Sequence, residues 1–129
     1  MLVDTSGWLC LIHKDETQHR EAARIYDAGS IYLTTDLILA ELVALARVRG
    51  FPRNKTIAFS RRILDDPTIT VVWTGEDICR RSIDLLEARA DKTYSLCDAA
   101  SFVIMRDHNL KDALTTDRHF EQEGFNKLL

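Results

Sequence analysis

Residues 1–7, with the sequence MLVDTSG, decide the fold of this chain. They open with three apolar residues, a pattern typical of a strand buried on both faces within a parallel sheet. Asp4 follows this strand directly. Because ligands of open α/β sheets bind at the carboxyl ends of the strands, Asp4 is the first candidate site residue. The alternative is that Asp4 or Thr5 only caps a short helix over residues 6–12.

Length and composition predict one ordinary domain. The chain has 129 residues, of which 46% are hydrophobic, enough for a single core in one domain over residues 1–129. Cys10, Cys79 and Cys97 form no CxxC pair, so we expect reduced thiols in the cytoplasm rather than a disulfide framework or a zinc site. No signal segment opens the chain, and its longest apolar run, residues 37–46, is too short to span a bilayer. We therefore expect a soluble protein that is not exported.

Strand and helix signals alternate along the chain. Strands are predicted at residues 31–33, 68–73 and 113–116, with a last edge strand at 125–129. Helices are predicted at residues 18–28, 36–49, 52–64, 74–90 and 95–108. The residues expected to cap helices are Thr17, Thr34, Thr35, Thr74 and Ser95, the last two with capping-box spacing. This rhythm predicts an α/β fold with a central parallel sheet of four to five strands flanked by helices.

Three further acids are candidates beside Asp4. Glu41 is the only charge in the run LILAELVALA and is predicted to lie on an apolar helix face, where it needs a partner or a cavity; alternatively it lies at the margin of that face. Asp98 falls in the first turn of the helix at 95–108, although Ser95 and Asp98 could simply form a capping box. Asp117 follows the strand at 113–116, where it could also merely mark a turn.

All four acids can converge at one edge of the sheet. Crowded carboxylates repel each other and raise each other's pKa unless a cation neutralises them. Oxygen ligands without an accompanying Cys–His cluster favour Mg²⁺ or Mn²⁺ over zinc. Such ions engage phosphates and activate water, so the predicted chemistry is hydrolysis of a phosphodiester bond.

Other classes of α/β protein fit the sequence less well. The five glycines form neither GxGxxG nor GxxxxGK[ST], and the four histidines form no HExxH. A receiver domain would have paired acids after the first strand, whereas Asp4 is single and the third strand ends in Trp73 and Thr74. A receiver-like or catalytically silent α/β module that acts through protein contacts remains the alternative from another class.

Four stretches resemble the PIN-domain nucleases: VDTSGW at 3–8, AEL at 40–42, SLCDAASFVIM at 95–105 and TTDRHFEQEGF at 115–125. The similarity is greatest to the VapC type, the ribonuclease toxins of toxin–antitoxin pairs. It implies a PIN-like three-layer α/β/α fold, dependence on Mg²⁺ or Mn²⁺, and endonucleolytic cleavage of RNA. It also implies a homodimer and a cognate antitoxin protein as partner. A PIN nuclease acting in RNA maturation is the alternative within the family.

The resemblance also assigns roles to residues. Asp4 and Asp98 match the principal metal ligands, while Glu41 and Asp117 match the acids that complete the site and hold water or a second ion. The hydroxyl positions beside these acids are matched by Thr5, Ser6 and Thr116. Cys97 stands where a threonine is common in the family, a departure expected to alter only packing or a hydrogen bond.

A basic segment is hidden by the net charge of −3, which by itself argues against a generally basic nucleic-acid-binding surface. Between Glu41 and Asp65 there is no acid but six bases, so the rest of the chain holds 20 acids against 11 bases. We predict that these residues bind RNA phosphates: Arg47, Arg49, Arg53, Lys55, Arg61 and Arg62. Phe51 or Phe59 could stack on a base if exposed, although burial is the stronger expectation. Alternatively, the bases are solvated helix faces that complement the helix dipole.

Overall fold

A parallel sheet of five strands lies at the centre of the computed structural model, which describes residues 1–29 and 31–129. The strands are β1 (Leu2–Val3), β2 (Tyr32–Thr35), β3 (Ile69–Val72), β4 (Asp112–Leu114) and β5 (Asn126–Lys127). Their order is β3-β2-β1-β4-β5, and each neighbouring pair runs parallel. The predicted α/β fold class is confirmed.

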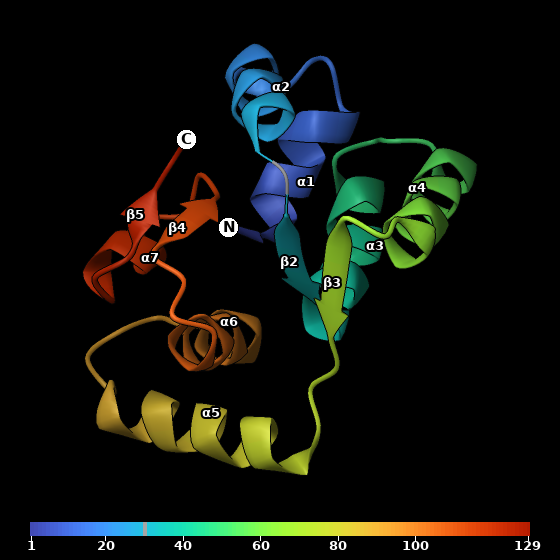
Figure 1. Ribbon diagram of the computed structural model, residues 1–129. Coiled ribbons are helices and arrows are strands. Elements are labelled where there is room, and N and C mark those ends of the chain that lie inside the picture. The colour runs from blue at the N-terminus through green and yellow to red at the C-terminus, as the bar shows by residue number, and fades with distance from the viewer. Residues whose placement is uncertain (30) are drawn as a thin grey trace.

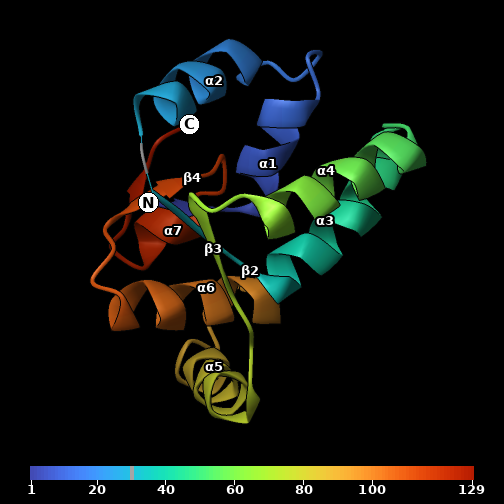
Figure 2. The same cartoon turned by 45° about the vertical axis from the view of Figure 1, so that its right-hand side comes forward.

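Helices cover the sheet on both sides. They are α1 (Thr5–Ile12), α2 (His19–Ala28), α3 (Asp36–Val48), α4 (Arg53–Asp65), α5 (Glu76–Ala88), α6 (Leu96–Asp107) and α7 (His119–Gln122). Helices α1 and α2 lie on one side of the strands, and α5 and α6 lie on the other, while α3 and α4 pack against each other at the edge near β3 (Figures 1 and 2). Among the described residues, no helix has the length and apolar character needed to cross a membrane.

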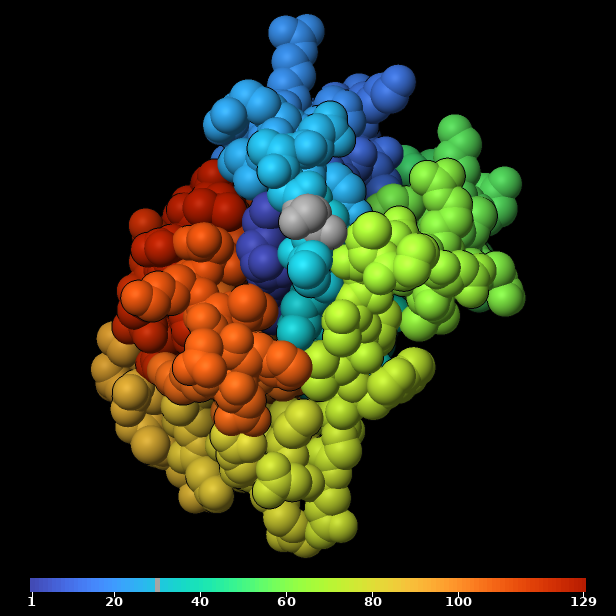
Figure 3. Space-filling model, in the orientation of Figure 1, coloured from blue at the N-terminus to red at the C-terminus, as the bar shows by residue number. Residues whose placement is uncertain are grey.

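The hydrophobic core is built around strand β1 and helix α6. Leu2 and Val3 of β1 are fully buried, as expected for a strand with neighbours on both edges and helices on both faces. Every residue of α6 from Ala99 to Met105 is also buried. On the face shown in Figure 3, the start of the chain is visible as a narrow dark blue strip between the C-terminal segment and β2.

Gly7 brings α1 unusually close to β4. A Cβ atom at this position would lie 2.1 Å from the carbonyl oxygen of Leu114, a distance that no side chain tolerates. The same carbonyl accepts a hydrogen bond from the backbone N–H of Asp4 at 3.2 Å. The absent side chain therefore lets the end of β1 and the start of α1 approach the end of β4.

Several element ends differ from their predictions. Thr34 and Thr35 belong to β2, because they pair with Val71 and Val72 of β3. Thr34 is therefore not a cap: its hydroxyl donates to the carbonyl of Val3, and only Thr35 caps α3. The expected cap at Thr17 is also wrong, since Gln18 precedes the first turn of α2 and its side chain makes no capping hydrogen bond.

The two predicted capping boxes have opposite outcomes. The box at Ser95 is confirmed: its hydroxyl accepts from the N–H of Asp98, and the Asp98 carboxylate accepts from the N–H of Ser95. The box at Thr74 is wrong because Gly75 occupies the cap position, while the N–H of Thr74 donates to Asp36 at 2.9 Å. Helix α7 was not predicted, since four residues are too few to show a helical period.

Candidate active site

A cavity of about 400 Å³ opens where β1 and β4 end and where α6 and α7 begin. All four predicted acids lie on its wall. Its lining consists of Asp4, Thr5, Ser6, Glu41, Leu45, Thr93, Ser95, Asp98, Thr116, Asp117 and His119. None of the described residues that line it is a lysine or an arginine. Four carboxylates are therefore gathered in one place, and His119 is the basic side chain among the described lining residues.

Asp4 is the most buried of the four acids, with 6% of its surface exposed. Its carboxylate accepts hydrogen bonds from the hydroxyls of Thr115 at 2.9 Å and Ser6 at 3.1 Å. It also caps α1, so the structural alternative for Asp4 holds alongside its place in the cavity. Burial raises the pKa of Asp4 to about 6, helped by the charges of Asp98 and Glu41, although the hydrogen bonds from Thr5 and Thr115 act the other way.

Hydroxyl groups connect the start of α1 with the loop after β4. The Ser6 hydroxyl lies 3.0 Å from that of Thr115 and accepts from the backbone N–H of Thr116 at 2.9 Å. Because β4 ends at Leu114, earlier than predicted, it is the hydroxyl of buried Thr115 that contacts Asp4. The Thr116 side chain lines the cavity instead, one position further along the loop.

Glu41 is exposed rather than directed into an apolar face, which corrects that part of the prediction. The buried stripe of α3 runs through Ile38, Leu42 and Ala46, and Glu41 lies one position beside it. This is the margin position named as its alternative. The predicted partner is present, however, because the hydroxyl of Thr5 donates to the Glu41 carboxylate.

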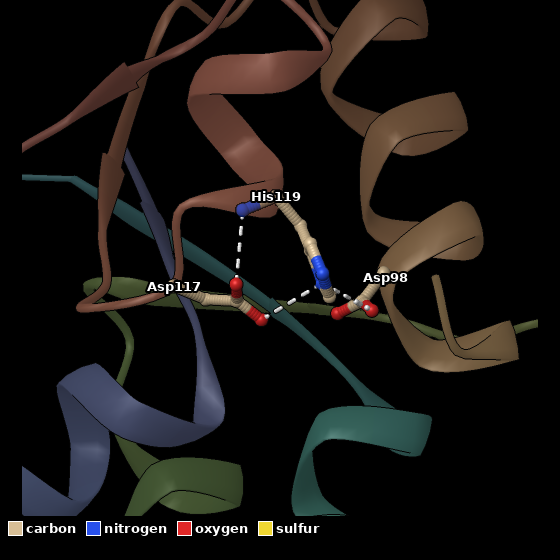
Figure 4. Close-up of side chains that lie close together, drawn as sticks. All are labelled: Asp98, Asp117 and His119. Atoms are coloured by element: carbon tan, nitrogen blue, oxygen red, sulfur yellow. Dashed lines mark hydrogen bonds and ion pairs between the residues drawn. The ribbon is translucent and has the colours of Figure 1, made fainter. Parts of the chain in front are cut away.

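Asp98, Asp117 and His119 lie close together in the cavity (Figure 4). The Nδ1 atom of His119 lies 3.3 Å from a carboxylate oxygen of Asp98 and 3.3 Å from one of Asp117. The backbone N–H of His119 donates to Asp117 at 2.9 Å, which fixes the turn into α7. The other ring nitrogen lies 3.2 Å from the hydroxyl of Thr93.

This group is suited to a divalent cation. One ligand atom from each of Asp98, Asp117 and His119 lies within 4.8 Å of the others. The charges of Asp98 and Glu41 add to the burial that raises the pKa of Asp4, so a cation held among these acids would favour the ionised form of Asp4. Two carboxylates suit Mg²⁺ or Mn²⁺, and an imidazole nitrogen extends the range toward Mn²⁺ and Zn²⁺.

His119 and Thr115 were missed as site residues in the sequence. His119 follows Asp117 by two residues, and this spacing of a metal-ligand residue type within TTDRH was the available signal. Thr115 could not be separated from Thr116 because the end of β4 decides which hydroxyl faces Asp4. Cys97, beside this site, remains a neutral thiol: burial and then the charges of Glu41, Asp4 and Asp98 raise its pKa.

The predicted RNA-binding residues lie outside this cavity, on the end of α3 and on α4. All six are exposed. Arg49 pairs with Glu16 at 2.9 Å, and the Arg62 guanidinium lies 6.0 Å from the ring centre of Phe59. Phe59 is half-buried and packs edge-on against Trp8, with 5.7 Å between ring centres.

Comparison with known proteins agrees with this architecture. The chain is 26% identical over 126 residues to proteins named 23S rRNA-specific endonuclease VapC20, from two strains of Mycobacterium tuberculosis, CDC 1551 / Oshkosh and ATCC 25618 / H37Rv. The alignment covers 97% of this chain and 95% of each relative.

A solved structure is similar over the same length. The crystal structure of Mycobacterium tuberculosis VapC20, described as a sarcin-ricin loop cleaving toxin, superposes with a TM-score of 0.90 at 25% identity. The superposition covers 98% of this chain and 96% of that one. Residues 1–126 match the PIN domain, which confirms the resemblance predicted from the sequence. The chain belongs to the PIN-domain family.

Proposed function

We propose that this protein is a metal-dependent endoribonuclease of the VapC toxin type, which hydrolyses RNA phosphodiester bonds and is inhibited by a partner antitoxin. The observation that carries the proposal is the convergence of Asp4, Glu41, Asp98 and Asp117 in one cavity, where the described lining residues include no lysine or arginine. Membership of the PIN family and similarity to a relative named as a 23S rRNA-specific endonuclease support it.

Asp4 and Asp98 would hold Mg²⁺ or Mn²⁺, with Glu41 and Asp117 completing the site. When bound, such an ion supplies charge stabilisation at the phosphate and lowers the pKa of a bound water. We favour Mg²⁺ or Mn²⁺ over zinc because the carboxylates outnumber the single imidazole of His119.

The side chains of this protein orient the acids and accept a proton. The hydroxyls of Ser6 and Thr115 fix the orientation of Asp4, and Thr5 holds one oxygen of Glu41. Glu41 is the most exposed of the four acids, so its carboxylate can be reached by solvent and can take a proton from the attacking water. His119 positions Asp98 and Asp117 relative to each other.

We further propose that the protein works in the cytoplasm as a homodimer. Val48, Trp73 and Ile83 expose 80%, 66% and 43% of their surfaces, so each offers apolar area that a protein contact could remove from water. A second subunit or the antitoxin would cover them. Light scattering that gives a monomer mass at every concentration would contradict the homodimer.

Cleavage of defined RNAs tests the nuclease. Purified protein should cut single-stranded RNA and an RNA hairpin with the sarcin-ricin loop sequence when Mg²⁺ or Mn²⁺ is present, and should stop in EDTA. Asp98→Asn should reduce the rate at least about 100-fold. The control is Asp107→Asn on the same helix, whose carboxylate pairs with Arg81 outside the cavity, and it should cleave at the wild-type rate.

Three results would contradict the proposal. Cleavage that persists in EDTA, or that is equal in Asp98→Asn and Asp107→Asn, would show a different mechanism or a contaminating nuclease. A folded protein that cuts no RNA under these conditions but binds a partner protein would favour the silent binding module.

A further inference from the structure

A second cavity, of about 240 Å³, adjoins the acid cavity. The two share Ser6, Leu45 and Thr116 in their walls. The second cavity extends between α1 and α3, which pack against each other, to the connection between α1 and α2. The rest of its lining consists of Leu9, Cys10, Glu16, Gln18 and Arg49.

Opposite charges face this cavity as a pair. The Nη1 atom of Arg49 lies 2.9 Å and 3.2 Å from the two carboxylate oxygens of Glu16. The Glu16 side chain is 19% exposed and that of Arg49 is 52% exposed, so a ligand can reach both. Gln18, half-buried beside them, makes no capping hydrogen bond with its side chain. A donor fork and an acceptor therefore lie side by side.

Backbone contacts hold the pair in place. The N–H of Glu16 donates to the carbonyl of His13, and the carbonyl of Glu16 accepts from the N–H of His19, each at 3.0 Å. His19 in turn lies 2.7 Å through Nδ1 from the carbonyl of Cys10, which ties the loop to α1. Arg49 ends α3, with its N–H donating to Leu45 at 2.9 Å. A ligand would thus meet groups that are already positioned.

A phosphate is a poor match for this cavity. The carboxylate of Glu16 neutralises Arg49 and would repel a second anion. Leu9 and Leu45 add apolar wall, which suits the flat face of a base. The charge pair thus distinguishes Arg49 from Arg47, for which the structure gives no such acidic partner among the described residues.

We propose that this cavity binds a guanine base of the substrate RNA, next to the phosphate at the acid site; this rests on the proposed nuclease function. The Arg49 guanidinium can donate to O6 and N7 of guanine. The Glu16 carboxylate can accept from the adjacent N1–H and N2–H groups. Guanine presents two acceptors on one edge and two neighbouring donors on another, so it satisfies both side chains, whereas adenine and uracil leave one of them with at most a single partner.

The test is binding of single-stranded oligouridylates that carry one guanine, adenine or cytosine at the centre. Asp98→Asn protein, which should not cut them, is titrated by fluorescence anisotropy, and wild-type protein is assayed for the position of its cuts. We expect the guanine oligonucleotide to bind about tenfold more tightly than the others, and cleavage to fall beside the guanine. Arg49→Lys, which keeps the charge but loses the fork, should remove most of this preference.

Matched variants separate a base contact from a phosphate contact. Arg47→Lys keeps the charge two residues away and should retain the guanine preference. Glu16→Gln should weaken binding of the guanine oligonucleotide only. Thermal unfolding checks that each variant is folded. No guanine preference in Asp98→Asn protein, or an affinity loss that is equal for all oligonucleotides when Arg49→Lys is added to it, would overturn this proposal while cleavage by wild-type protein itself stands. Failure of wild-type protein to cut or bind any RNA would instead refute the nuclease function.

Discussion

Asp4 connects the stability of the metal-free protein to pH. Its pKa is about 6 in the folded protein, above the ordinary value of 3.8, so folding favours its protonated form. The stabilisation from protonated Asp4 is therefore fully present below about pH 4 and is lost as the pH rises through about 6. This loss lowers the free energy of unfolding by about 3 kcal/mol. Asp4→Asn should remove this loss.

Urea denaturation in EDTA at several pH values between about 4 and 7 measures this effect. The unfolding free energy of wild type is subtracted from that of Asp4→Asn at each pH, because this subtraction cancels the titration of all other groups. The difference should increase across this pH range. A difference that stays constant with pH would show that Asp4 is already compensated in the metal-free protein.

Adding the metal should reverse the penalty. At a concentration about 100 times its dissociation constant, Mn²⁺ or Mg²⁺ should stabilise the fold by about 2.7 kcal/mol, which raises Tm by about 10 °C. Differential scanning fluorimetry should show this rise in wild type and in Asp107→Asn, and its near absence in Asp98→Asn. An equal rise in all three would exclude Asp98 as a ligand.

At the residue scale, the sequence predicted the positions of the acids in the cavity better than those of the residues around them. Asp4, Asp98 and Asp117 could be predicted because carboxyl ends of parallel strands and nearby helix starts meet at one edge. The contribution of His119 could not, because it depends on how the loop after β4 turns into α7. Glu41 was predicted on a buried helix face but is exposed, because a shift of one residue along α3 moves a side chain from the buried stripe to its margin.

At the scale of the elements, Glu123 fastens the segment after α7 to α5 and α6. Its side chain is only 2% exposed and pairs with Arg106 at 2.6 Å and Arg89 at 2.7 Å. Burial raises its pKa, but the hydrogen bonds from Arg106 and Arg89 outweigh burial and leave the pKa below its ordinary value. Its stabilisation is present at neutral pH and is lost as the pH falls through the folded pKa.

Glu123→Gln should therefore destabilise the protein by roughly 1–2 kcal/mol at pH 7, because the buried carboxylate is lost while its two arginine partners, each 43% exposed, stay solvated. Glu121→Gln, on the exposed side of α7, should change stability by less than about 0.5 kcal/mol. Chemical denaturation measures both. Similar small effects in the two variants would mean that the ion pairs contribute little.

The element boundaries show where local sequence rules stop applying. Strand β2 continues through Thr34 and Thr35 because pairing with β3 continues there, although threonines before a helix favour caps. Ser95 did form its capping box, while Gly75 displaced Thr74 from the equivalent role. The order of the strands had no counterpart in the sequence pattern, since all strands of a parallel sheet have similar apolar runs.

At the scale of the whole molecule, charge is divided between an acidic site and a basic segment. Replacing both Arg53 and Lys55 with glutamine should weaken binding to all single-stranded RNAs and reduce the slope of log affinity against log salt by about 1.4. Metal stabilisation should be unchanged. Arg20→Gln, an exposed base on α2, is the control and should leave the slope as in wild type.

Anisotropy titrations at several salt concentrations measure the slope. If the double variant and Arg20→Gln give the same slope as wild type while RNA is still bound, the RNA does not cross α4. The basic segment could be predicted from the sequence because charge counts need no structure. Its position relative to the acid cavity could not, because it depends on how α3 and α4 pack at the edge of the sheet.

Gly7 has a further consequence for how members of this family are classified. Any side chain there would push the start of α1 away from the Leu114 carbonyl, and Asp4 and Ser6 would move with it. A gene could then keep all four acids and still encode an inert protein. An inventory of acidic residues is thus an incomplete test of activity, and the seventh residue should be read together with them.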